Sequence, residues 1–263
     1  MTVMARTLKV AVVVALLIAF PMGCSEHQPP PTPPPHLLLI SLDALRADHL
    51  SSHGYHRHTT PFLDDSLREL FGRLDEIGFL DNAVVLITAD HGEEFGDHGG
   101  LLHRGSLFDE LVRVPFIVWG RGVESGVVDP TLVSTIDIPP TLLAAAGIGP
   151  SPTMEGRDVL APSPVAWADQ RVFAQYRDVL YSIRTPRFKL IRGPGRRLRL
   201  FDLENDSNER RNLARDRPEL AVELDTELEF WRLARPRIGG DGASTTELDP
   251  ATEERLRTLG YID

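Results

Sequence analysis

The stretch that decides the fold is NAVVLITADHGEEF, at residues 82–95. Residues 83–87 form an unbroken apolar run rich in β-branched side chains, which predicts a strand buried on both faces of a parallel sheet. The run stops at Asp90, His91 and Gly92. Because ligands of open α/β sheets bind beyond the carboxyl ends of the strands, Asp90 and His91 are candidate metal ligands. The alternative is that they only cap the next helix.

A second apolar run, LLLISL at residues 37–42, also ends in a carboxylate, Asp43. Between the two runs, apolar side chains recur at intervals of three and four from Leu63 to Ile77, which predicts a helix. Asp64 or Asp65 can cap its start and Gly78 can end it. Such a helix gives a right-handed βαβ unit, so Asp43 can converge with the two later candidates.

Length and composition allow one sizeable core with an appended smaller unit, because the chain has 263 residues, of which 42% are hydrophobic and 25% are charged. Residues 1–36 hold two of the 28 cations and one of the 38 anions, so the remainder carries a net charge of −11. This charge argues against nucleic acid as a partner.

The first 24 residues have the pattern of a signal segment. Arg6 and Lys9 precede an apolar run over 10–20 that is too short for a comfortable membrane span. Cys24, the single cysteine, follows at a position similar to the lipidation site of bacterial lipoproteins. Pro21 stands where such sites usually have Leu, so ordinary signal cleavage remains an alternative. We expect an exported cell-envelope lipoprotein that faces outside the cytoplasm.

Residues 25–36 follow as a proline-rich tether, with six prolines between His27 and His36. Further along, histidines crowd one loop: His49, His53, His56 and His58. Their spacing matches no helical face or zinc finger, so we interpret them as solvated loop residues rather than as a metal patch.

The glycine-rich stretch 96–105 reads as a loop over the site, which places His98 and His103 to meet a ligand. Ser106 with Asp109 then predicts a capping box at the start of a short helix. The next apolar run, residues 114–119, predicts another strand.

The second half of the chain predicts a small antiparallel unit. Its strands are expected at 172–176, 180–191 and 198–203, with a turn at 193–195, and a helix is expected at 218–233. The cations Arg184, Arg187 and Lys189 can form an anion site or a solvated strand face, and the pattern favours the solvated face.

In a series of motifs, the chain resembles bacterial sulfatases of the alkaline phosphatase superfamily. The motifs follow the family's order and lie at 40–50, 59–61, 86–96, 103–115, 134–143, 146–148, 155–157, 182–191, 200–206 and 256–261. The resemblance implies an α/β fold with an alkaline-phosphatase-like, mostly parallel sheet flanked by helices, and a small C-terminal antiparallel subdomain. It divides the folded part into a truncated α/β core at 37–160 and a C-terminal subdomain at 161–263.

The same resemblance implies a site. Asp43, Asp90 and His91 would hold one divalent metal ion, commonly calcium, and His103 would contact the sulfate. Many sulfatases have a second Asp directly after the first ligand, where this chain has Ala44. Because calcium prefers six to eight oxygen ligands, the loss of one makes manganese or zinc a candidate as well.

The nucleophile of the family is missing. Sulfatases attack with a formylglycine made from the first residue of a Cys/Ser-x-Pro-x-Arg motif, and no such motif occurs here. Thr60 and Pro61 are followed by Phe62 and Leu63, so the segment that carries the motif in the family is expected to be excised at this join. No catalytic nucleophile is identified. The excision should also leave sheet edges or apolar faces uncovered.

Two functions from different classes follow. One is a metal-dependent hydrolase that acts on sulfate or related phosphate esters of a small molecule or glycan, attached to a membrane through lipidated Cys24 and impaired by the missing segment. The other is a non-catalytic, lipid-anchored pseudoenzyme or binding protein, or the product of an internally deleted sulfatase gene.

Overall fold

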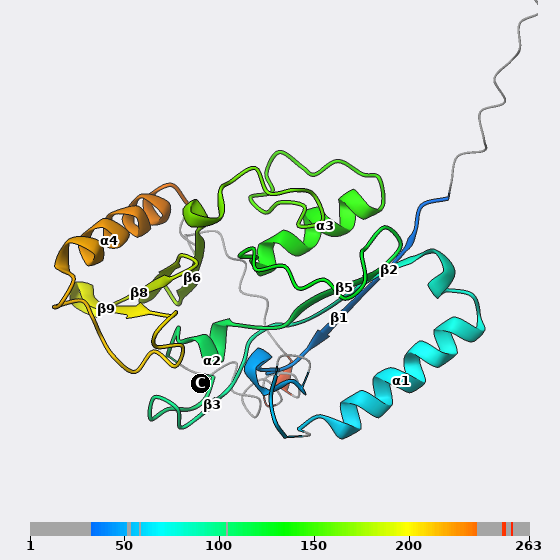
Figure 1. Cartoon of the computed structure of the whole chain (residues 1–263), viewed down its shortest axis with the longest axis horizontal. Coiled ribbons are helices and arrows are strands. Elements are labelled where there is room, and N and C mark those ends of the chain that lie inside the picture. The colour runs from blue at the N-terminus through cyan, green and yellow to red at the C-terminus, as the bar shows by residue number, and fades with distance from the viewer. Residues whose placement is uncertain are drawn as a thin grey trace, which may run out of the picture. The chain divides into compact units, whose positions relative to one another are not determined.

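The structure, a computed structural model, describes residues 33–51, 54–57, 59–103, 105–235, 249–250 and 254 (Figure 1). The expectations for the signal segment, for Cys24, for His53 and His58, and for the closing motif at 256–261 lie outside these residues. Every helix in the described ranges is too short or too polar to traverse a lipid bilayer.

The central sheet has three strands in the order β1-β2-β5: β1 (His36–Leu42), β2 (Ala83–Ala89) and β5 (Phe116–Gly120). β1 and β2 are parallel, and their register runs from His36 opposite Ala83 to Leu42 opposite Ala89. β5 is antiparallel to β2. The sheet is therefore mixed, and the expected mostly parallel sheet is wrong. A parallel return needs a long crossover helix, whereas only a loop, a short hairpin and one helical turn join β2 to β5.

β2 is buried as predicted, with Val84, Val85 and Leu86 at most 1% exposed. β1 was expected to be equally buried, but its Leu37 and Leu39 are 39% and 48% exposed. The physical reason is its place at the edge of the sheet, with β2 as its one strand neighbour among the described residues. An uncovered apolar edge of this kind was expected from the short join before α1.

Helix α1 (Pro61–Glu76) follows β1, and in Figure 1 the central sheet lies between α1 and α3 (Ile138–Ala145). Thr60 is its N-cap and Pro61 its first residue, so the expected capping by Asp64 or Asp65 is wrong. The predicted end at Gly78 is confirmed.

The end of α1 has the hydrogen bonds of a Schellman motif. Gly78 has a φ of +70°, its N–H donates to Asp75 O at 2.8 Å, and the N–H of Phe79 donates to Leu74 O at 2.9 Å. Glycine adopts this left-handed backbone at little cost, so the chain turns sharply toward β2.

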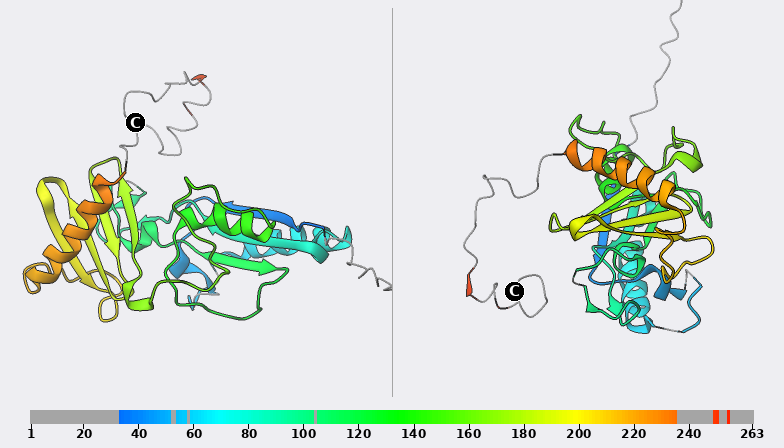
Figure 2. Two further views of the ribbon diagram at one scale, coloured as in Figure 1. Left: turned by 90° about the horizontal axis from the view of Figure 1, so that it is seen from above. Right: turned by 90° about the vertical axis from the view of Figure 1, so that its left-hand side faces the viewer.

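The C-terminal sheet is antiparallel and confirms the predicted small subdomain. Its order is β6 (Val172–Tyr176), β7 (Leu180–Arg184), β8 (Phe188–Gly193) and β9 (Arg197–Asp202). The predicted run 180–191 is two strands, because the chain turns after Arg184 and the N–H of Thr185 donates to Phe188 O at 2.8 Å. Helix α4 (Pro218–Leu233) lies across one face of this sheet (Figure 2) and buries Ala221, Leu224 and Leu228.

Lys189 of β8 joins this sheet to the loops that follow β2. Its side chain is 1% exposed, and its Nζ lies 2.7 Å from Asp109 Oδ1 and 2.9 Å from Glu209 Oε1. Arg184 also pairs with Asp109, whereas Arg187 pairs with Asp202 at 2.8 Å. The favoured interpretation of these three cations as a solvated face is therefore wrong for Lys189. Each of the three cations pairs with a carboxylate of the chain, which argues against an anion site.

Asp109 opens the short helix α2 (Asp109–Val112). Burial alone would raise the pKa of Asp109, but the charges of Lys189 and Arg184 and their hydrogen bonds outweigh it and hold this pKa well below its usual value. Burial raises the pKa of Glu209. The expected capping box is absent, because Ser106 Oγ accepts from the N–H of Phe108 and Glu209 accepts from the N–H of Asp109.

Candidate metal centre

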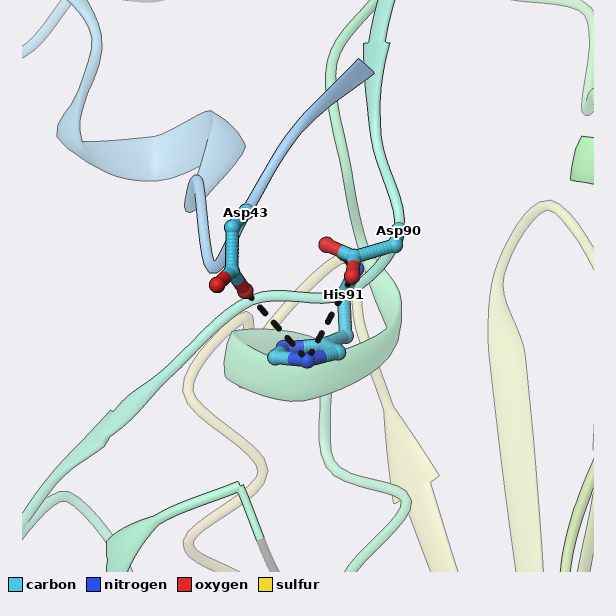
Figure 3. A group of neighbouring side chains, drawn as sticks. All are labelled: Asp43, Asp90 and His91. Atoms are coloured by element: carbon cyan, nitrogen blue, oxygen red, sulfur yellow. Dashed lines mark hydrogen bonds and ion pairs between the residues drawn. The ribbon is translucent and has the colours of Figure 1, made fainter. Parts of the chain in front are cut away.

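The structure brings the three predicted metal ligands together at the carboxyl ends of β1 and β2 (Figure 3). Asp43 follows β1, and Asp90 and His91 follow β2. One ligand atom from each lies within 4.8 Å of the other two. His91 Nε2 is 3.7 Å from Asp43 Oδ1 and 3.7 Å from Asp90 Oδ2. The parallel register explains this meeting, because Leu42 pairs with Ala89 and the next residue of each strand is an aspartate.

The ring of His91 is held in one orientation by its own loop. Its Nδ1 lies 2.8 Å from Gly92 O, and a carbonyl can only accept, so Nδ1 carries the proton in this contact. Nε2 then presents its lone pair toward the two carboxylates. This is the arrangement by which proteins orient a histidine that binds a metal through Nε2.

Asp90 is also oriented by the backbone. Its Oδ1 accepts from the N–H of His91 at 2.9 Å and from the N–H of Ala44 at 3.3 Å, which directs Oδ2 toward His91 Nε2. Ala44 adopts a φ of +55° in this loop. That left-handed backbone is unusual for alanine and is tolerated better by Gly, Asn and Asp.

Gly92 allows the loop to pack closely against α2. A Cβ at this position would lie 1.9 Å from Glu110 O, so any larger residue would displace the backbone. The N–H groups of Gly92 and Glu93 donate to Leu111 O at 2.8 Å and Glu110 O at 3.0 Å. The glycine of the Asp-His-Gly sequence is therefore needed for packing rather than for flexibility.

His103 lies directly beside this cluster. Its ring stacks on that of His91 with centroids 4.5 Å apart, and its Nδ1 is 3.6 Å from Glu93 Oε2. The side chain of His103 is 16% exposed. The predicted substrate-binding residue is thus placed next to the predicted metal ligands.

His98, which was also expected to meet a ligand, has a packing role. Its Nδ1 bonds to Glu110, its Nε2 lies 3.2 Å from Glu209 O, and its ring stacks on Phe108 with centroids 3.5 Å apart. Protein groups thus occupy both ring nitrogens, and His98 is not one of the three clustered ligands.

Arg46 organises the loops around the site, and the sequence reasoning gave it no role. The residue is 5% exposed, and its guanidinium donates to Asp48 at 2.7 Å, to Asp97 at 2.7 Å and to Glu93 O at 3.1 Å. These hydrogen bonds hold the pKa values of Asp48 and Asp97 below their usual range. Arg46 thereby ties the loop after β1 to the loop after β2. A basic residue three positions after a strand-end aspartate was the one available signal.

The donor set at this site suits a divalent cation. Two carboxylate oxygens and one imidazole nitrogen are ligands that manganese and zinc accept. Two ligands that each lie about 2.1 Å from a shared ion at a tetrahedral angle are about 3.4 Å apart, close to the spacing seen here. Asp43 and Asp90 are 58% and 42% exposed, so solvent or a substrate can reach the same point.

A family model, curated relatives and solved structures all match this chain, and all three comparisons indicate the sulfatase family. A family model described as "Sulfatase" matches residues 62–148. Arylsulfatase K of Mus musculus is 30% identical over 182 residues, which cover 63% of this chain and 33% of that protein. The chain thus spans about a third of the length of this curated relative.

Two solved structures are similar to this chain in fold as well as in sequence. A phosphonate monoester hydrolase of Agrobacterium radiobacter is 26% identical, with a TM-score of 0.53 over 65% of this chain and 38% of that one. A 2-O GAG sulfatase is 25% identical, with a TM-score of 0.52 over 64% of this chain and 39% of that one. The chain is therefore a member of the sulfatase family, within the alkaline phosphatase superfamily, and carries part of the sulfatase domain.

Proposed function

We propose that this chain binds one divalent metal ion through Asp43, Asp90 and His91, and that it binds the sulfate or phosphate group of an ester beside that ion at His103. The observation that carries the proposal is the meeting of three ligand atoms within 4.8 Å at two adjacent strand ends. Three protein ligands leave positions for water or for an ester oxygen, and they make an ion site of low to moderate affinity.

Manganese or zinc fits this donor set better than calcium. Calcium takes six to eight oxygen ligands, whereas the cluster offers two carboxylates and a nitrogen. The ion, when bound, supplies Lewis acidity toward an ester oxygen. The residues of the chain orient the donors: the Gly92 carbonyl fixes the ring of His91, and the backbone N–H groups fix Asp90.

The ligand class follows from His103 and from the relatives. An imidazole next to the ion can donate to an ester oxyanion, whether it belongs to sulfate or to phosphate. The relatives with solved structures act, by name, on a sulfated GAG and on phosphonate monoesters. The proposed partner is accordingly a small-molecule or glycan ester of sulfuric or phosphoric acid.

We propose further that turnover is strongly impaired. Covalent catalysis divides a difficult displacement into two easier steps, and the sequence lacks the formylglycine motif that supplies this route in the family. Removal of a catalytic nucleophile costs on the order of 10⁶ in rate for subtilisin, a comparable covalent hydrolase. A binding protein with the metal and oxyanion groups of a sulfatase fits these residues best.

The test is calorimetric titration of the purified protein with Mn²⁺, Zn²⁺ and Ca²⁺, beside Asp90→Asn and the surface control Asp65→Asn. We expect Mn²⁺ or Zn²⁺ to bind at one site, Asp90→Asn to lose this binding, and Asp65→Asn to keep it. Equal binding by the two variants would reject the site.

The metal-loaded protein is then assayed on a chromogenic aryl sulfate and on a phosphodiester. We expect no turnover at a sulfatase rate. Robust turnover that Asp90→Asn abolishes would reject the impairment and point to a different attacking group.

A further inference from the structure

A second cleft, of about 710 Å³, lies away from the metal centre. Its walls come from the segment 132–137, from edge strand β6, and from the end of α4. None of Asp43, Asp90, His91 and His103 lines it. The volume is in the range of small-molecule sites, and the cleft is formed between elements of the described chain rather than on one surface loop.

Gln170 lines this cleft and offers an amide donor to it. The residue is 7% exposed, and its Oε1 accepts from the N–H of Leu132 at 2.9 Å, which fixes the amide plane. No acceptor in the described ranges pairs with its Nε2. This amide group can therefore donate to a ligand oxygen that enters the cleft.

Arg157 is the cation of the cleft that forms no short-range ion pair with a described residue, and the charge of Asp129 acts on it from a longer distance. Its Nη2 donates to Leu132 O at 3.3 Å, and no carboxylate of the described residues lies within ion-pairing distance. The two other arginines of the cleft are neutralised: Arg171 pairs with Glu227 at 2.8 Å, and Arg235 pairs with Glu155. The remaining donors of Arg157 thus form a place for an oxyanion.

The rest of the lining is mainly apolar and carries a few polar groups that can bind hydroxyls. The exposed carboxylate of Asp169 and the amide of Gln175 can bind hydroxyl groups. Apolar surface comes from Phe173 and Trp231, whose rings stack with centroids 4.9 Å apart. An oxyanion site, hydroxyl partners and an apolar wall together match an acidic sugar.

We propose that this cleft binds an anionic mono- or disaccharide, whose sulfate or carboxylate pairs with Arg157 and whose ring oxygens accept from Gln170. This site is independent of the metal centre, so the chain has two separate places for an acidic glycan. It rests on the geometry of the cleft and not on the proposed metal binding.

The experiment titrates the full chain with N-acetylglucosamine 6-sulfate in the presence of a chelator, with calorimetry and tryptophan fluorescence as readouts. We expect saturable binding and a change in emission from Trp231. Arg157→Gln should weaken binding about ten- to a hundredfold, as expected for loss of a charge-assisted hydrogen bond, and Arg157→Lys should weaken it less. Circular dichroism confirms that both variants are folded.

Two matched controls separate the cleft from the metal centre. Arg215→Gln makes the same charge change at an exposed arginine, and Asp90→Asn removes a metal ligand; both should bind the sugar as the unchanged chain does. Absence of binding, equal binding of unsulfated N-acetylglucosamine, or unchanged binding in Arg157→Gln would overturn the proposal. Loss of sugar binding in Asp90→Asn would also overturn it, because the sugar would then occupy the metal centre.

Discussion

The imidazole rings of His91 and His103 stack with their centroids 4.5 Å apart. The proposed oxyanion-binding residue therefore lies against a proposed metal ligand, and an ester group that reaches one residue also reaches the other. The two residues are twelve positions apart in the sequence and lie on either side of the short hairpin that follows β2, and the Asp-His-Gly turn is held against α2 by backbone hydrogen bonds.

His103→Ala should weaken binding of inorganic phosphate to the manganese-loaded protein about tenfold, because a hydrogen bond to a charged group is lost. His103→Lys should restore part of it, since it keeps a cationic donor. Manganese affinity should change little in both variants. Calorimetry measures both affinities, and His56→Ala, at an exposed loop histidine, is the control. A loss of manganese binding in His103→Ala would mean that His103 supports the ion rather than the oxyanion.

Ala44→Asp should raise calcium affinity by about tenfold or more, because it returns a hard oxygen ligand beside Asp43. Aspartate also tolerates the left-handed backbone that Ala44 adopts at a φ of +55°. Ala44→Gly relieves the same backbone without adding oxygen, so it serves as the matched control. Equal calcium affinities in the two variants would show that this position does not face the ion.

Lys189→Met should reduce the free energy of unfolding by about 3–5 kcal/mol, because it leaves Asp109 and Glu209 buried without their cation. Arg187→Gln removes a cation from a 45% exposed side chain in the turn just before β8 and should lower the free energy of unfolding much less. Urea unfolding at neutral pH compares them. Similar midpoints for the two variants would contradict the buried network.

Lowering the pH should reduce the free energy of unfolding through protonation of Glu229. Hydrogen bonds from Arg232, together with Arg192, lower the pKa of Glu229 from 4.5 to about 2. Because the pKa of Glu229 is lower in the folded state, its carboxylate contributes fully to the free energy of unfolding above pH 4.5. This contribution is lost as the pH falls toward about 2.

Glu229→Gln should therefore flatten the fall in the free energy of unfolding over that window, by about 1 kcal/mol at most for a partly exposed pair. Glu223→Gln, on the exposed face of the same helix, should leave the curve unchanged. Parallel curves for Glu229→Gln and the unchanged chain between pH 2 and 5 would reject this assignment.

Cys24→Ser should release the protein from membranes or leave it unprocessed, if Cys24 carries the lipid as we propose. Stable anchoring takes more than one acyl chain, so the loss should be nearly complete. Fractionation and the mass of the mature N-terminus measure it. Unchanged fractionation and processing would leave ordinary secretion as the explanation.

Local patterns in the sequence predicted much of the fold. Apolar runs and helical periodicity placed β2, α1 and α4, and the identity of the residues after two runs brought Asp43, Asp90 and His91 to one edge. That inference needed only the rule that parallel neighbours end at the same edge of a sheet. The glycine-rich loop predicted that His103 meets a ligand, and the resemblance to sulfatases specified contact with the sulfate.

The remaining features depend on partners distant in the chain. Arg46 meets Asp97 across 51 positions, Lys189 meets Asp109 across 80, and His98 meets Glu209 across 111. The sequence alone does not distinguish a buried, paired charge on a strand from a solvated charge. Lys189 was therefore assigned to a solvated strand face. The direction of β5 was missed for a related reason, because its apolar run is the same in either orientation.

The ion pairs that join Asp109 to β7 and β8 have a consequence for evolution and for protein engineering. A cut at residues 160–161 looks natural from the motifs, yet it would leave each fragment with half of a buried charge network. Neither piece could then be exchanged among relatives without its counterpart. The two halves should melt in a single cooperative transition, and gene fusions that replace one of them should retain the sequence of both sides of this contact.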